Sequence, residues 1–253
     1  METNTTSSFS SFNETKSGMS SKAQFLLLFI TSFYVGIQLI ANVCAGKVLA
    51  LPFGLYVAGA AAFFPLVGIP QDIISNCFGS SIMKKTALTS IIMNIVLAVL
   101  ATLIVIWPGA VFFTNSDAYS TVLQQSIRLV ISGLVALWFS TMVNSLVLQK
   151  IKRKQVENNK STTDRKGIFY RAYISSIPSV ILDSIIFNTL SWLGNMAFSQ
   201  ILVMIGCQIA IKLIVELVLQ IPISTALIPH VVKATGMDAI DDGSEKALNP
   251  FKI

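Results

Sequence analysis

Six long apolar stretches occupy most of this chain of 253 residues and constrain its fold more than any other feature. About 20 apolar residues in helical form cross the hydrocarbon core of a bilayer, which is roughly 30 Å thick. The strands of a transmembrane β-barrel would instead alternate polar and apolar residues over runs of about 10. The pattern predicts an all-α fold, namely a polytopic membrane protein with six transmembrane helices. The stretches lie near residues 23–46, 52–78, 86–107, 125–148, 168–193 and 198–229.

The basic residues are gathered in alternate loops between these stretches. Lys84 and Lys85 separate the second stretch from the third, whereas the loop after the third holds Asp117 and the loop around Gly194 has no charge. Basic loops stay in the cytoplasm, so both termini are predicted to be cytoplasmic. The net charge of +6 is therefore interpreted as a topology signal rather than a nucleic-acid surface. The most basic loop, between the fourth and fifth stretches, holds Lys150, Lys152, Arg153, Lys154, Lys160, Arg165 and Lys166.

The two ends of the chain differ in composition from its apolar middle. Residues 1–22 are rich in Ser, Thr, Asn and Glu, which is typical of a disordered extension, here expected in the cytoplasm. Residues 23–232 form the predicted six-helix domain. Residues 233–253 carry several acidic side chains and are expected to be a cytoplasmic tail.

The residue types that build catalytic and cofactor sites are scarce. His230 is the single histidine, so the chain cannot assemble a His-based metal site or a Ser-His-Asp triad. Cys44, Cys77 and Cys207 all lie in apolar stretches and lack the spacing of metal ligands. A Walker-type phosphate-binding loop does not occur in the sequence. We therefore expect no enzyme activity, no cofactor and no metal site.

Two of the apolar stretches carry a polar stripe. An ionisable residue at mid-bilayer costs about 2.5–3.5 kcal/mol on the insertion scale, so each one needs a partner or a use. Residues four apart lie along one helix face. Asp183 and Lys212 are expected at similar depths and are predicted to pair, and Asp72 adds an acid on the second stretch. The stripes consist of Arg171, Ser175, Ser179 and Asp183 on the fifth stretch, and Gln208, Lys212, Glu216 and Gln220 on the sixth.

The stripes have two interpretations. Polar side chains can hold membrane helices together for about 0.6 kcal/mol each, and Lys212 and Glu216 can pair within one helix. Alternatively, the stripes and Asp72 line a solute pathway, which is the interpretation that we favour. Arg171 is expected at the cytoplasmic interface, where its long side chain can serve as an anchor.

Four segments of the sequence resemble the queuosine-precursor transporter family, also called the VUT family. They are ANVCAGK (41–47), FFPLVGIPQDIISNCFG (63–79), RAYISSIPSVILD (171–183) and IKLIVELVLQIP (211–222). The resemblance covers about residues 23–232 and implies a six-helix protein of the bacterial inner membrane. It implies an architecture like that of the substrate-binding components of energy-coupling-factor transporters, without their ATPase module. It also implies uptake of 7-cyano-7-deazaguanine, 7-aminomethyl-7-deazaguanine or queuine.

The stripes and the resemblance together predict a substrate-binding site. Asp72 and Asn76, four apart, are expected to bond a guanine-like edge, while Phe64, Phe78 or Tyr173 stacks on the base. The resemblance marks most of the set below, whereas Asn76 and Glu216 are included because of their spacing. The predicted substrate-binding residues are Asn42, Lys47, Asp72, Asn76, Arg171, Ser175, Ser179, Asp183, Lys212 and Glu216.

Three positions depart from the family pattern. Asn76 stands where the family typically has Glu, Asn144 where it has an acid near the end of the fourth helix, and Val180 where it has Gln. Because polar contacts set selectivity, these departures leave the exact ligand open.

Three function hypotheses follow. The first is a secondary importer of a 7-deazaguanine-like small molecule, with no nucleic-acid partner and no ATPase module. The second is a binding component for another purine-like or vitamin-like molecule, energised by a separate ATPase complex. The third is a membrane scaffold whose stripes only hold helices together. The coupling ion and a homo-oligomeric state stay open.

Overall fold

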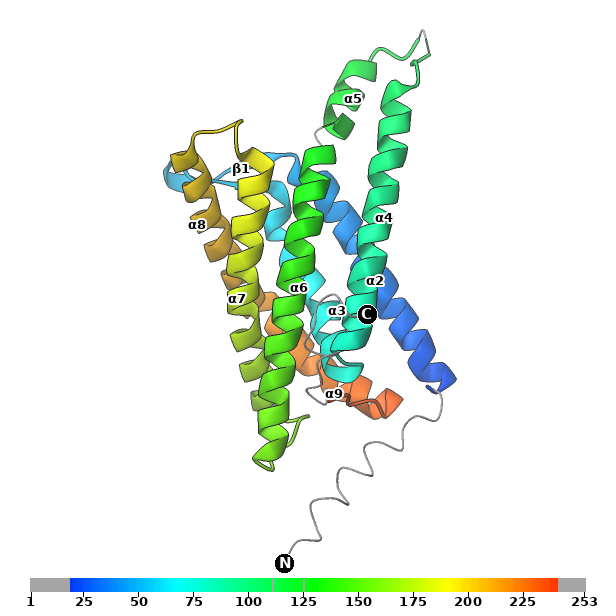
Figure 1. The fold of residues 1–253 in the computed structure, drawn as a ribbon, viewed down its shortest axis with the longest axis vertical. Helices are drawn as coiled ribbons and strands as arrows, with labels where there is room; N and C mark the ends of the chain where they lie inside the picture. Colours follow the sequence, from blue (N-terminus) through cyan, green and yellow to red (C-terminus); the bar gives the residue numbers. More distant parts are fainter. Residues whose placement is uncertain (1–18, 111, 125, 241–253) are drawn as a thin grey trace, which may run out of the picture.

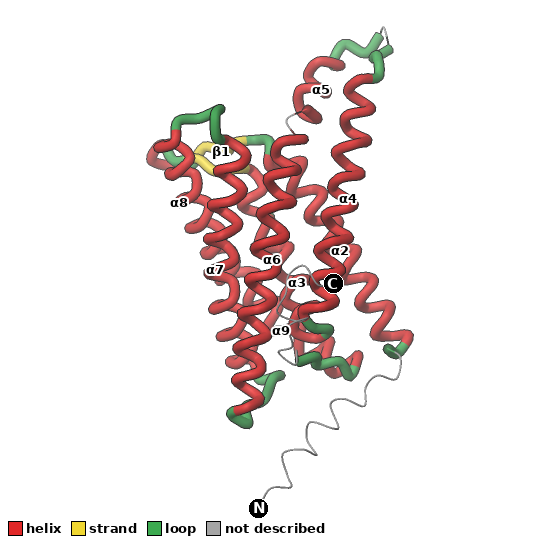
Figure 2. Tube along the Cα trace, viewed as in Figure 1, coloured by secondary structure: helices red, strands yellow, loops and turns green. Residues whose placement is uncertain are grey.

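The computed structural model of the chain describes residues 19–110, 112–124 and 126–240. This part of the chain is mostly helical, with one short β-hairpin (Figure 2). The predicted N-terminal extension, apart from its last residues, and positions 241–253 of the predicted tail lie outside the described residues.

Eight α-helices of the described chain are joined by short turns (Figure 1). The hairpin consists of β1 (Val48–Ala50) and β2 (Tyr56–Ala58), with the 3₁₀ turns η2 (Pro52–Gly54) between them and η3 (Gly59–Ala62) after them. A π-helical turn, η4 (Glu216–Gln220), joins α8 to α9. The helices are α2 (Ser21–Ala45), α3 (Phe64–Cys77), α4 (Ser80–Ile106), α5 (Ser116–Gln124), α6 (Ser126–Glu157), α7 (Arg165–Trp192), α8 (Phe198–Val215) and α9 (Ile221–Thr235).

Five segments of the described chain are helical, long and apolar enough to cross a membrane. They correspond to the first, third, fourth, fifth and sixth predicted stretches. Large apolar side chains are exposed on their outer faces, such as Phe25 at 70% and Leu103 at 55%, whereas many polar side chains are buried inside. This arrangement suits a bundle that contacts lipid outside and satisfies its polar groups internally. The all-α prediction is confirmed.

Of the second predicted stretch, residues 52–78, only Phe64–Cys77 forms an α-helix. Pro52 and Gly54, whose φ is 72°, turn the chain into the hairpin. After the hairpin, Gly59 packs directly against the end of α2. A Cβ atom at this position would lie 2.6 Å from the carbonyl oxygen of Cys44, so only glycine allows this close approach. Helix α3 then has 14 residues, about 21 Å at 1.5 Å per residue, which is shorter than a bilayer core.

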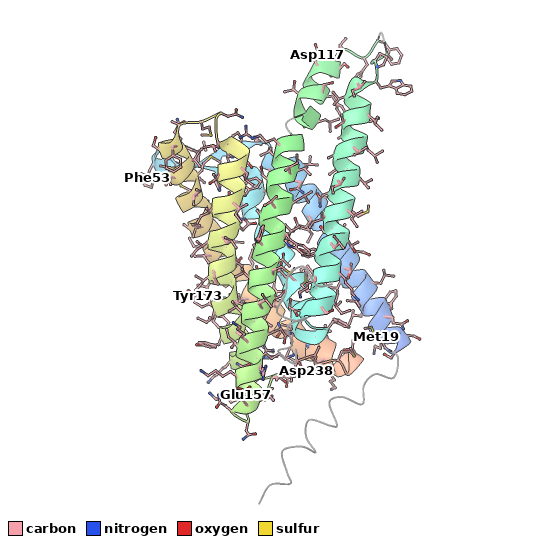
Figure 3. The ribbon with its side chains drawn as sticks, in the orientation of Figure 1. Met19, Phe53, Asp117, Glu157, Tyr173 and Asp238 are labelled. Carbon is pink, nitrogen blue, oxygen red and sulfur yellow. The ribbon has the colours of Figure 1, made fainter. Side chains whose placement is uncertain are left out.

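The two ends of the bundle differ in charge. Met19, Glu157 and Asp238 lie at one end, and Phe53 and Asp117 lie at the other (Figure 3). The basic turn between α6 and α7 is therefore at the end where the described chain begins and finishes. We call this the basic end, and the other the hairpin end. The arrangement agrees with an even number of crossings.

The π-helical turn η4 keeps the polar stripe of the sixth stretch facing inward. Side chains four apart drift by about 40° per step in an α-helix of 3.6 residues per turn, so a long stripe would rotate toward lipid. In η4 the amide of Ile221 bonds to the carbonyl of Glu216, five residues back, and this wider turn offsets the drift. Pro222, which has no N–H group, follows the turn directly. As a result Gln208, Lys212, Glu216 and Gln220 are all buried.

Candidate functional site

A buried ion pair joins α7 to α8 near the middle of the bundle. The Nζ atom of Lys212 donates to Oδ2 of Asp183, and the two side chains are 4% and 6% exposed. The predicted pairing of the two stripes is confirmed. Two charges removed from water in this way need each other, because a buried charge without a partner is strongly unfavourable.

A hollow lies on each side of the Asp183–Lys212 pair, and both of its residues line both hollows. The upper hollow, toward the hairpin, has small apolar walls from Ala41, Ala45, Ala58, Ala60, Ala61 and Gly133, with Asn42, Phe187 and Gln208 beside them. The lower hollow, toward the basic end, has polar walls that include Gln71, Ser140, Asn144, Ser176, Ser179, Glu216 and Gln220.

The hollows enclose about 360 Å³ (upper) and about 400 Å³ (lower), including their open mouths. Only a narrow part of each is wide enough for water molecules. A flat solute of the size of a purine therefore enters only when the lining helices move apart. The structure accordingly shows a closed arrangement of these walls.

Asp72 anchors a polar cluster beside the lower hollow rather than lining it. Its Oδ2 atom accepts hydrogen bonds from Nε2 of Gln220 at 3.0 Å and from the hydroxyl of Ser224 at 3.2 Å. Gly68 makes this contact sterically feasible, because a Cβ atom there would lie 2.1 Å from the Gln220 amide. The second stretch thus contributes an acid that positions Gln220 at the wall of the hollow.

The predicted pair of Asp72 and Asn76 does not face a common ligand space. The Asn76 amide donates to the backbone carbonyl of Asp72 at 2.7 Å and accepts from Nε of Arg171 at 2.7 Å. Arg171 also donates to Gln155 at 2.9 Å and is fully buried. The Arg171 side chain therefore does not extend to the surface as an anchor would, and it is engaged inside the bundle, shortly after α7 begins at Arg165.

The segment that follows α9 closes the basic end. Lys152, fully buried, donates to Asp238 at 2.5 Å and to the backbone carbonyls of Ala239 at 2.8 Å and of Asn76 at 2.5 Å. The amide of Ala239 donates to the carbonyl of Cys77 at 3.0 Å. Residues of the predicted tail therefore pack on α3 and α6 in the described structure.

The structure brings only part of the predicted site together. Asn42, Ser179, Asp183, Lys212 and Glu216 line the hollows, and these residues stay candidates for substrate contact.

The other predicted residues lie elsewhere. Lys47 is exposed in the turn before β1, and the Ser175 hydroxyl bonds to the carbonyl of Ala172 at 3.1 Å. Of the predicted stacking residues, Phe78 is buried away from both hollows, while Tyr173 stacks on Phe169 with ring centroids 6.5 Å apart. The Phe64 side chain is outside the described part of the structure.

The predicted substrate-binding set contained no residue of α6, although Asn144 was noted as a departure from the family pattern. Ser140 and Asn144, four apart, line the lower hollow, and the Thr141 hydroxyl donates to Gln71 at 3.2 Å. The same four-residue spacing that marks the other stripes was a usable signal here. Phe187, on the wall of the upper hollow, had no such signal because it lies among other apolar residues of α7.

Residues 58–227 match the model of a protein family described as "Putative vitamin uptake transporter". The chain belongs to this family. The matched region holds the ion pair and every lining residue of both hollows except Ala41, Asn42 and Ala45. No curated protein and no solved structure matches the chain. Membership of this transporter family and the apolar helices make the chain a multi-pass membrane protein of a transport family.

Proposed function

We propose that this protein is a secondary importer of queuosine precursors, the 7-deazaguanines, in the bacterial cytoplasmic membrane, with both termini in the cytoplasm. The family supports transport of a small molecule. The segments that resemble the queuosine-precursor transporters favour the 7-deazaguanine class. The basic turn between α6 and α7 favours the orientation.

The observation that carries the proposal is the pair of hollows, the lower one lined by polar side chains, on either side of the buried Asp183–Lys212 ion pair. Polar side chains that only hold helices together would pack against one another without space between them. Here residues of α2, α6, α7 and α8 border the two hollows instead of filling them. Ion pairs and irregular helices at this depth are typical of solute pathways.

Transport requires the walls of the two hollows to open in turn. Proline and the π-helical turn interrupt the backbone hydrogen bonds of the lining helices, with Pro178 in α7 and η4 after α8. These interruptions lie close to the Asp183–Lys212 pair along the chain. We propose that the helices bend there. The ion pair then separates the upper hollow, which opens to the outside, from the lower hollow, which opens to the cytoplasm.

The test measures queuosine in the tRNA of a bacterial strain that lacks both 7-deazaguanine synthesis and its own importer. Expression of this chain is expected to restore queuosine in tRNA when 7-cyano-7-deazaguanine, 7-aminomethyl-7-deazaguanine or queuine is supplied. Restoration by none of the three rejects the ligand class. Co-purification of an ATPase pair with the chain would instead favour a binding component that needs a separate energy source.

A further inference from the structure

The lower hollow is lined by acceptor atoms that have no donor within the described part of the chain. Asn144 Oδ1, Glu216 Oε2 and Gln220 Oε1 are buried and have no hydrogen-bond partner among the described residues. The three residues are 2%, 7% and 3% exposed, and all three line the same hollow. Buried acceptors are normally paired, so this group marks a place for a molecule that donates hydrogen bonds.

The neighbouring contacts fix which end of the Gln220 amide faces the hollow. Its Nε2 atom donates to the Asp72 carboxylate at 3.0 Å, and an ionised carboxylate can only accept. The Oε1 atom is therefore the free end. Glu216 presents an acceptor whichever way its carboxylate turns.

The charges around the lower hollow also favour a donor. Asp183 and Lys212 neutralise one another at its upper boundary. Glu216 adds a carboxylate that has no ion pair within 4 Å among the described residues. Ser176 and Ser179 on α7 are neutral; their hydroxyls donate to backbone carbonyls of α7, and Ser176 also lies within hydrogen-bond reach of the Glu216 carboxylate.

We infer that the lower hollow binds the N–H edge of an amino-substituted heterocycle. Asn144, Glu216 and Gln220 accept hydrogen bonds from that edge. The inference rests on the proposed function. It assigns recognition of the ligand to these three residues rather than to Asp72 and Asn76, which line neither hollow. A ring of this class offers an exocyclic amino group next to ring N–H groups, and these donors match a cluster of acceptors. A ligand without the amino group leaves at least one acceptor unpaired, so the site discriminates against it.

The test uses the purified full-length chain and two compounds that differ only in the exocyclic amino group, 7-deazaguanine and 7-deazahypoxanthine. The wild-type protein is expected to bind the amino compound about tenfold or more tightly. Glu216→Gln is expected to reduce that ratio to below about threefold by weakening the amino compound alone. Asn144→Leu is a second variant that is expected to lower the ratio in the same direction.

Glu157→Gln is the matched control, because it makes the same chemical change on an exposed side chain at the basic end and should keep the ratio. Equal binding of the two compounds by the wild-type protein overturns the inference without any variant, while the proposed function stands. An unchanged ratio in both Glu216→Gln and Asn144→Leu also overturns it. If neither compound binds, this inference fails, while the proposed function is decided by the uptake of the three queuosine precursors.

Discussion

Replacing Asp183 with Asn removes the carboxylate from an ion pair whose side chains are 6% and 4% exposed. Breaking a buried pair by removing one partner costs about 3–5 kcal/mol, since the remaining charge loses its compensation. An exposed pair costs about 0–1 kcal/mol. Asp183→Asn is therefore expected to lower the free energy of unfolding of the detergent-purified protein by several kcal/mol. Lys212→Gln should have a similar effect.

The double variant separates stability from transport. Removing both charges leaves no uncompensated ion, so Asp183→Asn with Lys212→Gln should cost only about 1–2 kcal/mol, far less than the sum of the single changes. If the pair also separates the two hollows, the double variant folds but does not recover uptake. If the protein were a scaffold, the double variant would instead regain both its stability and its scaffold activity.

The measurement is a double-mutant cycle of denaturant unfolding in detergent, with uptake recorded for the same four proteins. Glu157→Gln serves as the control, because the Arg153–Glu157 pair is 50% and 57% exposed and should be worth about 0.5 kcal/mol. The reasoning is refuted if Asp183→Asn costs no more than this control, or if the two single costs simply add.

Three further changes probe other parts of the structure. Asp238→Ala takes the carboxylate from fully buried Lys152 and should destabilise the basic end by about 3 kcal/mol, measured by unfolding; a change below 1 kcal/mol would contradict the packing of this segment. Gly68→Ala places a Cβ atom 2.1 Å from the Gln220 amide and should cost about 1–3 kcal/mol and weaken uptake, whereas wild-type behaviour would mean that this contact is absent. Asn195→Cys in a cysteine-free background should react with a membrane-impermeant maleimide in intact cells, while a cysteine in the α6–α7 turn should not; the opposite labelling would invert the proposed topology.

The stripes could be predicted from the sequence because they depend on local periodicity. Four-residue spacing and similar depth were enough to place Asp183 opposite Lys212, and the structure confirms that pair. The burial of the Arg171 side chain could not be predicted, since it depends on where α7 begins and on tertiary contacts with Asn76 and Gln155.

The backbone irregularities were harder to predict. Pro52 and Gly54 are turn signals, but they lie in a stretch whose apolar content also suits a membrane span. The apolar content therefore led us to include both residues in the second predicted stretch. The π-helical turn at Glu216–Gln220 has no local composition signal beyond Pro222. It ends at Gln220, whose side chain bonds to Asp72, a residue far away in the sequence. Both irregularities border the hollows, where sequence-level rules are expected to fail.

Uptake by the purified chain alone is the most direct test of a solute pathway through the bundle. Proteoliposomes that contain only this protein should accumulate labelled 7-cyano-7-deazaguanine, 7-aminomethyl-7-deazaguanine or queuine in a saturable manner under an imposed ion gradient. The variant that combines Asp183→Asn with Lys212→Gln should incorporate equally well and show no accumulation. Uptake no greater than that of protein-free liposomes for all three compounds, or full uptake by the double variant, would contradict the account.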